Sequence, residues 1–249
     1  MTMHIIQITD LHVGIIGEDA HGVDVRQNFL SVLAAAVNAK PDLLVLTGDL
    51  CLRDPHKEVY EWMKEHLDAS GLRYEVIPGN HDESQMLATV FGRMNDLKEG
   101  ELYFQRIIDG RKLLFLDSAV GELSPRQMHW LREQLEQQEK QAIVFVHHPI
   151  VNGEVLFMEQ KYAMRGREPL QEVLHEFAFA VAVFCGHYHV DKVIVKGNIS
   201  CHITPSCYVQ IKENTMDFEA DHHRIAYRSI RLNEAGWSST VRYLEGHKA

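Results

Sequence analysis

Five short polar clusters in this sequence combine histidines with carboxylate or amide side chains. They read Asp10-Leu11-His12, Gly48-Asp49, Gly79-Asn80-His81-Asp82, His147-His148-Pro149 and Gly186-His187-Tyr188-His189. A single Asp or His after a strand is most often a turn former or a satisfied surface residue. Each of these clusters, however, directly follows an apolar stretch with the length of a strand. A shared chemical purpose explains the whole set better than coincidence.

The residue types in the clusters suit divalent metal ions. Carboxylate and amide oxygens combined with imidazole nitrogens are accepted by Mn, Fe, Zn or Co, whereas a structural zinc site would use cysteine. Seven side chains are candidate ligands, which is too many for one closed tetrahedral site: Asp10, His12, Asp49, Asn80, His147, His187 and His189. Two ions roughly 3.5–4 Å apart that share one carboxylate fit better, and such a pair clamps the attacking and the leaving oxygen of a displacement at phosphorus.

The first half of the chain predicts a scaffold that gathers these clusters. Apolar strand-like runs at residues 3–8, 43–46 and 73–77 alternate with amphipathic helical stretches at 26–38 and 56–69. This βαβαβ order implies mostly parallel pairing with right-handed crossovers. Because open α/β sheets bind ligands at the carboxyl ends of their strands, we expect the five clusters to meet on one edge of a layered sheet.

The second half changes character. Residues 102–108 and 112–116 flank a D-G turn and predict a hairpin, and Ser124 with Pro125 opens a helix in a capping-box pattern. Further strands are expected at 142–146 and 180–184, followed by a run of antiparallel strands at 190–195, 199–204, 224–231 and 238–244. The least structured stretches, where we expect substrate contacts, are 13–25, 151–167 and 212–223.

Composition predicts a globular protein and restricts its partners. The 45% hydrophobic content is in the globular range, and layered α/β folds of 249 residues often form one unit, so one domain over residues 1–249 is expected. The formal net charge of -10 disfavours broad contact with nucleic acid, whereas bound cations would let an acidic cleft take a small anion. No apolar run approaches the roughly 20 residues of a membrane-spanning helix. We expect a cytoplasmic protein with four reduced thiols, at Cys51, Cys185, Cys201 and Cys207.

Together, the five clusters closely resemble those of the calcineurin-like metallophosphoesterases, and the similarity runs from residue 4 to about the end of the chain. Within that superfamily the chain is most similar to the class III bacterial cyclic nucleotide phosphodiesterases. The shared features are the short cluster spacing and the segments Gly22-Val23-Asp24, Thr204-Pro205-Ser206 and Gly236-Trp237. The resemblance implies an α/β fold in the form of a four-layer sandwich, with two mixed β-sheets flanked by helices.

The resemblance also implies a role for each site residue. Asp10, His12 and His189 would hold a first metal ion, Asn80, His147 and His187 a second, and Asp49 would bridge the two. Iron and manganese are the implied ions, with zinc or cobalt as alternatives. Asn80 and His81 would be catalytic, with His81 facing the phosphate as a charge stabiliser or leaving-group acid. The implied substrate contacts are His12, Asp49, Asn80, His81 and His189.

One departure from related phosphoprotein phosphatases affects the histidine at position 81. Those enzymes have an Asp three residues after the bridging Asp, as a partner of this histidine, followed by an Arg on the phosphate. This chain has Leu52 and Arg53 at those positions. The partner of His81 is therefore unassigned, and a phosphoprotein substrate is disfavoured.

Other residues allow two interpretations. Phe157, Met158, Tyr162 and Met164 could line a pocket over the metals or pack in the core. His148 is expected to pack or hydrogen-bond locally. His222 and His223 are expected to be solvated.

These observations lead to one hypothesis with open alternatives. The chain is predicted to be a metal-dependent phosphoric diester hydrolase, in which a metal-bound hydroxide attacks a 3′,5′-cyclic nucleotide and converts cAMP to 5′-AMP. A glycerophosphodiester or another phosphodiester is the alternative substrate. A metal-bound scaffold without catalysis is the alternative from another class, because fold alone does not establish function. The expected partner is a small phosphodiester, with neither nucleic acid nor a membrane, and a homodimer or higher oligomer stays open.

Overall fold

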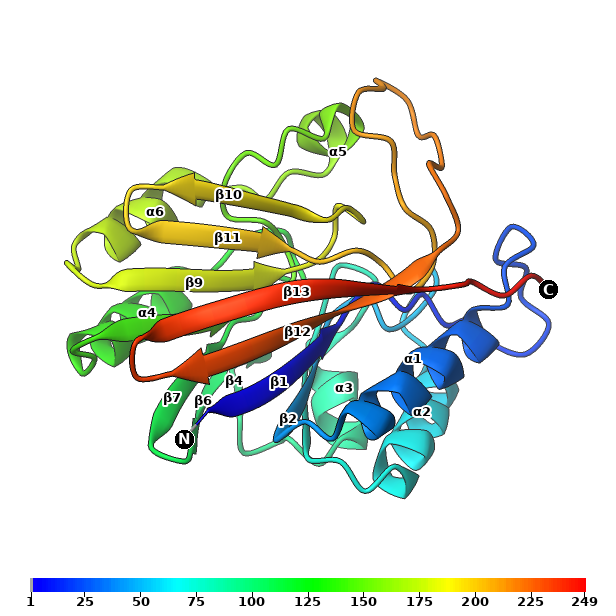
Figure 1. Ribbon diagram of the computed structural model, residues 1–249, viewed down its shortest axis with the longest axis horizontal. Coiled ribbons are helices and arrows are strands. Elements are labelled where there is room, and N and C mark those ends of the chain that lie inside the picture. The colour runs from blue at the N-terminus through cyan, green and yellow to red at the C-terminus, as the bar shows by residue number, and fades with distance from the viewer. Residues whose placement is uncertain (1) are drawn as a thin grey trace.

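The computed structural model describes residues 2–249 as two facing β-sheets with helices on both outer sides (Figure 1). On the outer side of the five-stranded sheet lie α1 (Val25–Ala39), α2 (Lys57–Ala69) and α3 (Ser84–Val90). On the outer side of the six-stranded sheet lie α4 (Pro125–Glu136) and α6 (Arg167–His175). The predicted fold class, a sandwich of two mixed sheets flanked by helices, is confirmed.

The five-stranded sheet contains the first half of the predicted scaffold. Its strand order is β13 (Gly236–Leu244), β12 (Ile225–Asn233), β1 (Met3–Ile8), β2 (Leu43–Thr47) and β3 (Tyr74–Ile77). β1, β2 and β3 pair in parallel, as the βαβαβ pattern predicts, while β12 pairs antiparallel with both β1 and β13. β2 is buried along its whole length, as expected for a central strand of a sheet covered on both faces.

The six-stranded sheet shows where the predicted strand run is wrong. Its order is β10 (Lys192–Lys196), β11 (Ile199–Ile203), β9 (Ala180–Cys185), β8 (Gln141–Phe145), β7 (Arg111–Phe115) and β6 (Phe104–Ile108). β10 and β11 are antiparallel, but β11 is parallel to β9, and β12 and β13 belong to the other sheet. The irregular segment 204–224 carries the chain across from one sheet to the other. Four successive strands therefore serve two sheets, which their spacing along the chain alone does not reveal.

Alternation of side chains along the strands builds two cores. In β7, β8 and β9 one set of alternating residues joins the core shared with β1 and β2, and the other set packs under α4 and α6. A row of stacked rings crosses the inner face, with centroid separations of 4.7 Å for Phe104–Phe115, 5.2 Å for Phe115–Phe145 and 5.6 Å for Phe145–Phe184. Cross-strand aromatic pairs of this kind stabilise a sheet and fix its register.

Local turn and cap chemistry appears where the sequence predicted it. Asp109 and Gly110 between β6 and β7 both have positive φ, of 49° and 74°, as a two-residue type I′ hairpin turn requires. Ser124 caps α4 by accepting a hydrogen bond from Gln127 N at 3.1 Å. The predicted loop 151–167 contains a short helix, α5 (Leu156–Lys161), and a small ribbon of β4 (Leu97–Lys98) and β5 (Glu101–Leu102) precedes β6. Within residues 2–249, each helix is too short or too polar to cross a bilayer.

Candidate metal centre

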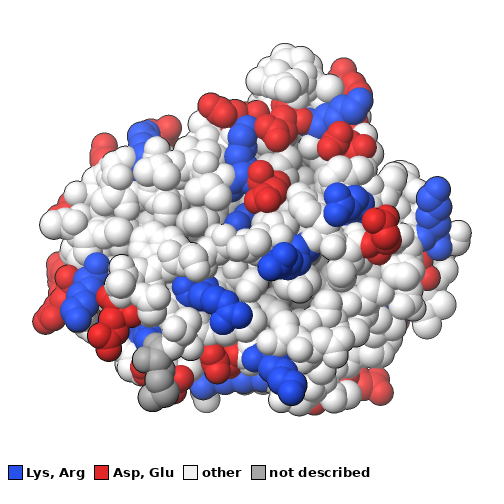
Figure 2. Space-filling view, viewed as in Figure 1, with Lys and Arg blue, Asp and Glu red and all other residues white. Residues whose placement is uncertain are grey.

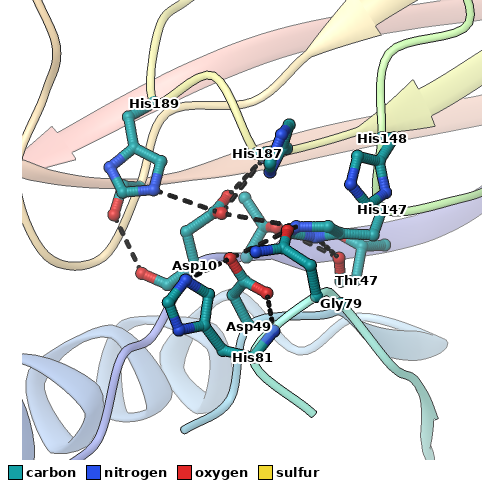
Figure 3. A network of polar contacts seen from close by, with 12 residues as sticks. Asp10, Thr47, Asp49, Gly79, His81, His147, His148, His187 and His189 are labelled. Carbon is teal, nitrogen blue, oxygen red and sulfur yellow. Dashed lines mark hydrogen bonds and ion pairs between the residues drawn. The ribbon is translucent and has the colours of Figure 1, made fainter. Parts of the chain in front are cut away.

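The five polar clusters come together at one end of the sandwich, but from two sheets instead of one. Those with Asp10, Asp49 and Asn80 follow β1, β2 and β3, whereas those with His147 and His187 follow β8 and β9 of the facing sheet. The expectation of a single sheet edge is therefore wrong in that respect. The sheets face each other with the carboxyl ends of these strands on the same side, so the clusters converge across the interface between them (Figure 3).

Glycine makes this convergence sterically possible. A Cβ at Gly48 would lie 2.6 Å from Gly79 N, and one at Gly79 would lie 2.2 Å from Asp49 Oδ1. A Cβ at Gly186 would lie 2.3 Å from Asp10 Oδ2, so it would collide with the opposite sheet. These approaches explain physically why glycine precedes the site residue in three of the clusters.

The backbone at the site is strained. Five of the seven predicted ligands have positive φ although they are not glycine: Asp10 at 52°, His12 at 46°, Asp49 at 50°, His187 at 68° and His189 at 54°. L-residues adopt this region rarely, and residues held there cluster at functional sites. The turn after each strand end is therefore shaped to aim a side chain, at a local cost in free energy.

The first group of predicted ligands is Asp10, His12 and His189. His189 Nε2 lies 3.2 Å from Asp10 Oδ1 and 3.2 Å from His12 Nε2. The other ring nitrogen of each histidine is near a backbone carbonyl, with His189 Nδ1 2.8 Å from Val209 O and His12 Nδ1 3.4 Å from Leu52 O. The carbonyls accept from Nδ1–H and so leave both Nε2 lone pairs directed at the cluster, as is usual for histidines that bind metal ions.

The second group is Asn80, His147 and His187. His147 Nε2 lies 3.2 Å from Asn80 Oδ1, while His147 Nδ1 donates to Thr47 O at 2.8 Å. His187 is turned the other way, because its Nε2 donates to Tyr162 O at 2.9 Å. Nδ1 of His187 is therefore the nitrogen left for an ion.

Asp49 lies between the two groups. Its Oδ2 is 3.3 Å from His147 Nε2 and 3.8 Å from His12 Nε2. Figure 3 shows Asp10 among the imidazoles of His147, His187 and His189, and Asp49 between His147 and His81. The position fits the bridging role that the resemblance implies for Asp49.

The donor set fits metal ions in type and in spacing. Donor atoms that each lie ~2.0–2.2 Å from one ion are about 3–3.5 Å from one another, which matches the separations of 3.2 and 3.3 Å in both groups. Three or more of these side chains at a time offer nitrogen and oxygen atoms within 4.8 Å of each other. The cofactor expectation is borne out to this extent, as His/Asp clusters able to hold metal ions.

The protonation states of the buried groups depend on this crowding. Burial alone would raise the pKa of Asp10, but attraction to His189 and His147 outweighs it and lowers the pKa to about 2. Burial lowers the pKa of His12 to about 3 and of His187 to about 4, so these imidazoles are neutral and able to coordinate. The pKa of His147 is raised to about 9 against the effect of burial, because Asp49 lies beside it. Binding an ion there must release that proton.

His81 has a different kind of partner from the one found in phosphoprotein phosphatases. Its Nδ1 donates to the backbone carbonyl of Arg53 at 2.9 Å, and its Nε2 lies 3.9 Å from Asp49 Oδ2. Its backbone N donates to Asp49 Oδ1 at 3.0 Å. A main-chain oxygen thus replaces the missing acid, so the absence of Asp at position 52 does not leave the ring without an orienting contact.

His148, which is not among the predicted ligands, lies beside the centre and offers a nitrogen atom within 4.8 Å of those of His147 and His187. His148 Nδ1 is 2.8 Å from Ser118 Oγ, and its ring packs at 4.2 Å from that of His187, in accord with the expected local hydrogen bonding. His223 is exposed, and His222 is only partly so, packing its ring at 5.8 Å from Tyr243. The expectation of solvation therefore holds for one member of this pair.

A cavity of about 480 Å³ opens over the cluster. Its floor includes His12, Asp49, Asn80, His81, His187 and His189, and its apolar side includes Phe157, Met158, Tyr162, Ile211 and Phe218. Phe157, Met158 and Tyr162 thus line a pocket, whereas Met164 is buried in the core under the six-stranded sheet. Sequence reasoning missed Phe218, Ile211 and Tyr208 as lining residues, because it pointed to this region only through the predicted loop 212–223, in which Phe218 alone lies.

Comparison with known proteins agrees with the geometry. Residues 3–191 match the family described as calcineurin-like phosphoesterase. The chain is 32% identical over 228 residues, covering 92% of it and 89% of the relative, to a probable cyclic nucleotide phosphodiesterase of Fibrobacter succinogenes. It is 28% identical to the 3′,5′-cyclic adenosine monophosphate phosphodiesterase CpdA of Escherichia coli, in an alignment that covers 96% of this chain and 88% of that relative. It is 29% identical to a probable glycerophosphodiester phosphodiesterase, GpdQ, of Arcobacter nitrofigilis, in an alignment that covers 75% of this chain and 72% of that relative.

A solved structure supports the fold. A dimetal phosphatase from Danio rerio superposes with a TM-score of 0.68 at 12% identity, covering 96% of this chain and 98% of that one. Because the family match spans most of the chain and the first of these relatives aligns over nearly its whole length, this protein belongs to the calcineurin-like phosphoesterase family.

Proposed function

We propose that this phosphodiester hydrolase acts on 3′,5′-cyclic nucleotides and converts cAMP to 5′-AMP. The observation that carries the proposal is the cavity over the metal centre, in which a polar floor of ligand residues meets an aromatic and aliphatic wall. Its volume of about 480 Å³ falls within the roughly 300–1,000 Å³ of small-molecule sites. The cyclic nucleotide phosphodiesterases named above, similar over most of this chain, support the same choice.

The proposed metal assignment follows the two groups of donors. Asp10, His12 and His189 would hold one ion, Asn80, His147 and His187 the other, and Asp49 both. Iron and manganese are the proposed pair, with zinc or cobalt as alternatives, because the donors are oxygen and imidazole nitrogen without thiolate. When bound, the ions supply Lewis acidity that activates water and stabilises charge on the phosphoryl oxygens.

The side chains around the floor supply the remaining chemistry. Asn80 and His81 are the proposed catalytic residues, and His12, Asp49, Asn80, His81 and His189 the substrate contacts, since all five line the cavity. The bond from His81 Nδ1 to Arg53 O fixes the ring with Nε2 toward the floor. From there His81 would stabilise charge on the phosphoryl group or give a proton to the departing 3′ oxygen.

The cavity wall favours a nucleobase over choline. Phe157 packs edge-on against Tyr162 at 5.5 Å and against Phe218 at 5.9 Å, which offers a surface for a flat ring. Lys161 Nζ lies 4.9 Å from the centroid of Phe157. Because the ammonium group of Lys161 already lies near this ring, it would repel a second cation there, such as the trimethylammonium group of glycerophosphocholine.

The glycerophosphodiester alternative keeps support from the GpdQ-named relative of Arcobacter nitrofigilis. The metal site would serve either diester, because it binds the phosphoryl group and leaves the alcohol to the loops. The metal-bound scaffold without catalysis is disfavoured, since it would need neither an open cavity over the donors nor an oriented His81 beside them.

Further parts of the proposal concern the whole protein. We propose that residues 1–249 form a single domain, because β12 completes the five-stranded sheet beside β1. A cytoplasmic location fits four buried, unpaired cysteines. On the face drawn in Figure 2, acidic and basic side chains are interspersed, which supports a small-molecule partner over nucleic acid or a membrane and leaves a homodimer or higher oligomer open.

The deciding experiment compares kcat/KM for cAMP, glycerophosphocholine and a simple phosphomonoester under one metal condition, because this ratio compares transition-state stabilisation. We expect cAMP to be preferred and the product 5′-AMP to stay largely intact. Preference for glycerophosphocholine would select the alternative substrate. A monoester preferred by tenfold or more would refute the diesterase assignment.

A further inference from the structure

Arg53 brings a full positive charge to the cavity but is bound to a carboxylate. The residue lines the cavity with Asp49 and His81. Its Nη1 contacts Glu18 Oε1 at 2.5 Å, and its Nη2 donates to Asp19 O at 3.1 Å. The guanidinium is therefore occupied by the loop 13–25, although 52% of the side chain is exposed.

Glu18 is itself held in place. Ile15 N donates to Glu18 Oε2 at 3.2 Å, and the side chain is only 17% exposed. A Cβ at Gly14 would lie 3.0 Å from that same Oε2, so the carboxylate packs closely against the start of its own loop. An exposed ion pair usually contributes little, but here the acid is fixed and partly buried before the arginine reaches it.

We propose that Glu18 is a specificity-determining residue. By binding the guanidinium, it keeps Arg53 from pairing with the phosphoryl group and cancels its charge. The cavity then favours a phosphoryl group with one negative charge, a diester, over a dianionic monoester. Arg53 without this partner would offer two parallel N–H donors to phosphate oxygens, and this pairing strengthens with charge on the phosphate. The inference rests on the proposed function in that it assigns the cavity to phosphoesters.

The test replaces Glu18 by glutamine, which retains the size of the side chain and removes its charge. The metal-loaded Glu18→Gln enzyme is compared with the original on 4-nitrophenyl phosphate and bis(4-nitrophenyl) phosphate, which share one leaving group. We expect the monoester-to-diester ratio of kcat/KM to rise about tenfold. The rise should shrink as ionic strength increases, because the new attraction is electrostatic.

Two controls separate charge from loop structure. Asp19→Asn removes a charge from the same loop but keeps the carbonyl that Arg53 contacts, so the ratio should not change. Adding Arg53→Gln to Glu18→Gln should return the ratio to within about twofold of the original, because the freed cation is gone.

Two outcomes would overturn the proposal: an unchanged ratio in Glu18→Gln, with or without an equal fall on both substrates, or the same rise in Asp19→Asn. An equal fall would show that Glu18 only supports the loop. Both test substrates are artificial, so the ratio decides this inference even if cAMP proves not to be hydrolysed.

Discussion

Replacing Asp82 tests how the site is held together. Its carboxylate is buried and ties the loop after β2 to the loop after β3, the loops that carry Asp49 and Asn80. It accepts four hydrogen bonds, from Leu50 N at 3.1 Å, Cys51 N at 3.3 Å, Gly79 N at 2.9 Å and Tyr60 Oη at 3.0 Å. We expect Asp82→Ala to loosen both loops and to lower the stability of the whole protein.

The size of the effect follows from two opposing contributions. A buried donor left without its acceptor costs ~1–3 kcal/mol, so four donors at about 2 kcal/mol each cost about 8 kcal/mol. Against this, burial and the neighbouring Asp49 raise the pKa of Asp82 from 3.8 to about 6. At ~1.4 kcal/mol per pKa unit, the ionised carboxylate carries a cost of about 3 kcal/mol at neutral pH, which alanine removes. The net loss expected for Asp82→Ala is about 5 kcal/mol, and about half of that for Asp82→Asn, which keeps one acceptor oxygen.

The assay is urea unfolding at neutral pH in the presence of a chelator, so that metal binding does not contribute to the free energy. Tyr60→Phe is the matched control, because it removes one of the four donors to Asp82, along with the hydroxyl that accepts from Glu83 N at 3.1 Å, and should cost only about 1–2 kcal/mol. An Asp82→Ala protein within about 1 kcal/mol of the original would refute the reasoning, since the loops would then be held by other contacts. Asp82→Asn gives the same test if the alanine variant does not fold.

Three further predictions concern the metals, the proton donor and pH. Asp49→Asn should lose most metal and activity, because an amide cannot bridge two ions with the same charge; two tightly held ions by elemental analysis, with full turnover, would contradict the two-metal assignment. His81→Ala should keep both metals but lower kcat by about two to four orders of magnitude. That loss should be smaller for nitrophenyl diesters, and an equal loss on activated and unactivated diesters would point to charge stabilisation instead. Burial, with Arg228 nearby, lowers the pKa of His202 from 6.5 to about 4 in the folded protein. Between these pH values the unfolded chain protonates this histidine and the folded protein does not, so the free energy of unfolding should fall by about 3 kcal/mol as pH drops from 6.5 to 4. Urea titrations of metal-free protein should show a weaker pH dependence in His202→Gln, and an unchanged one would exclude this source.

The parts of the fold that sequence predicts are those determined by neighbouring residues. The Asp109-Gly110 turn and the Ser124 cap depend on local backbone preferences, and both appear as expected. The pairing of β12 with β1 joins Met3 to Leu232. No local pattern predicts this partner, because β11 also mixes buried and less buried residues but lies in the other sheet.

The site shows the same division between side-chain chemistry and backbone geometry. Asp10 and His189 were predicted because five polar clusters follow apolar strand-like stretches, and these two residues lie together. The orienting contacts come from backbone carbonyls of Thr47, Val209 and Arg53. Every residue has such a carbonyl, so its role depends on where the chain places it and has no signature in the sequence.

The backbone conformation at the site implies that its geometry is held before any ion binds. Non-glycine residues in the left-handed region cost of order 1–3 kcal/mol each, and the five at this site, from Asp10 to His189, would together cost about as much as a domain's whole stability of ~5–15 kcal/mol. Contacts within the protein must offset this strain. Asp10 provides one, because its carboxylate accepts a hydrogen bond from His187 N across the sheet interface at 2.9 Å. Such contacts fix the donors in the arrangement that the ions require, so metal binding does not also have to order the loops.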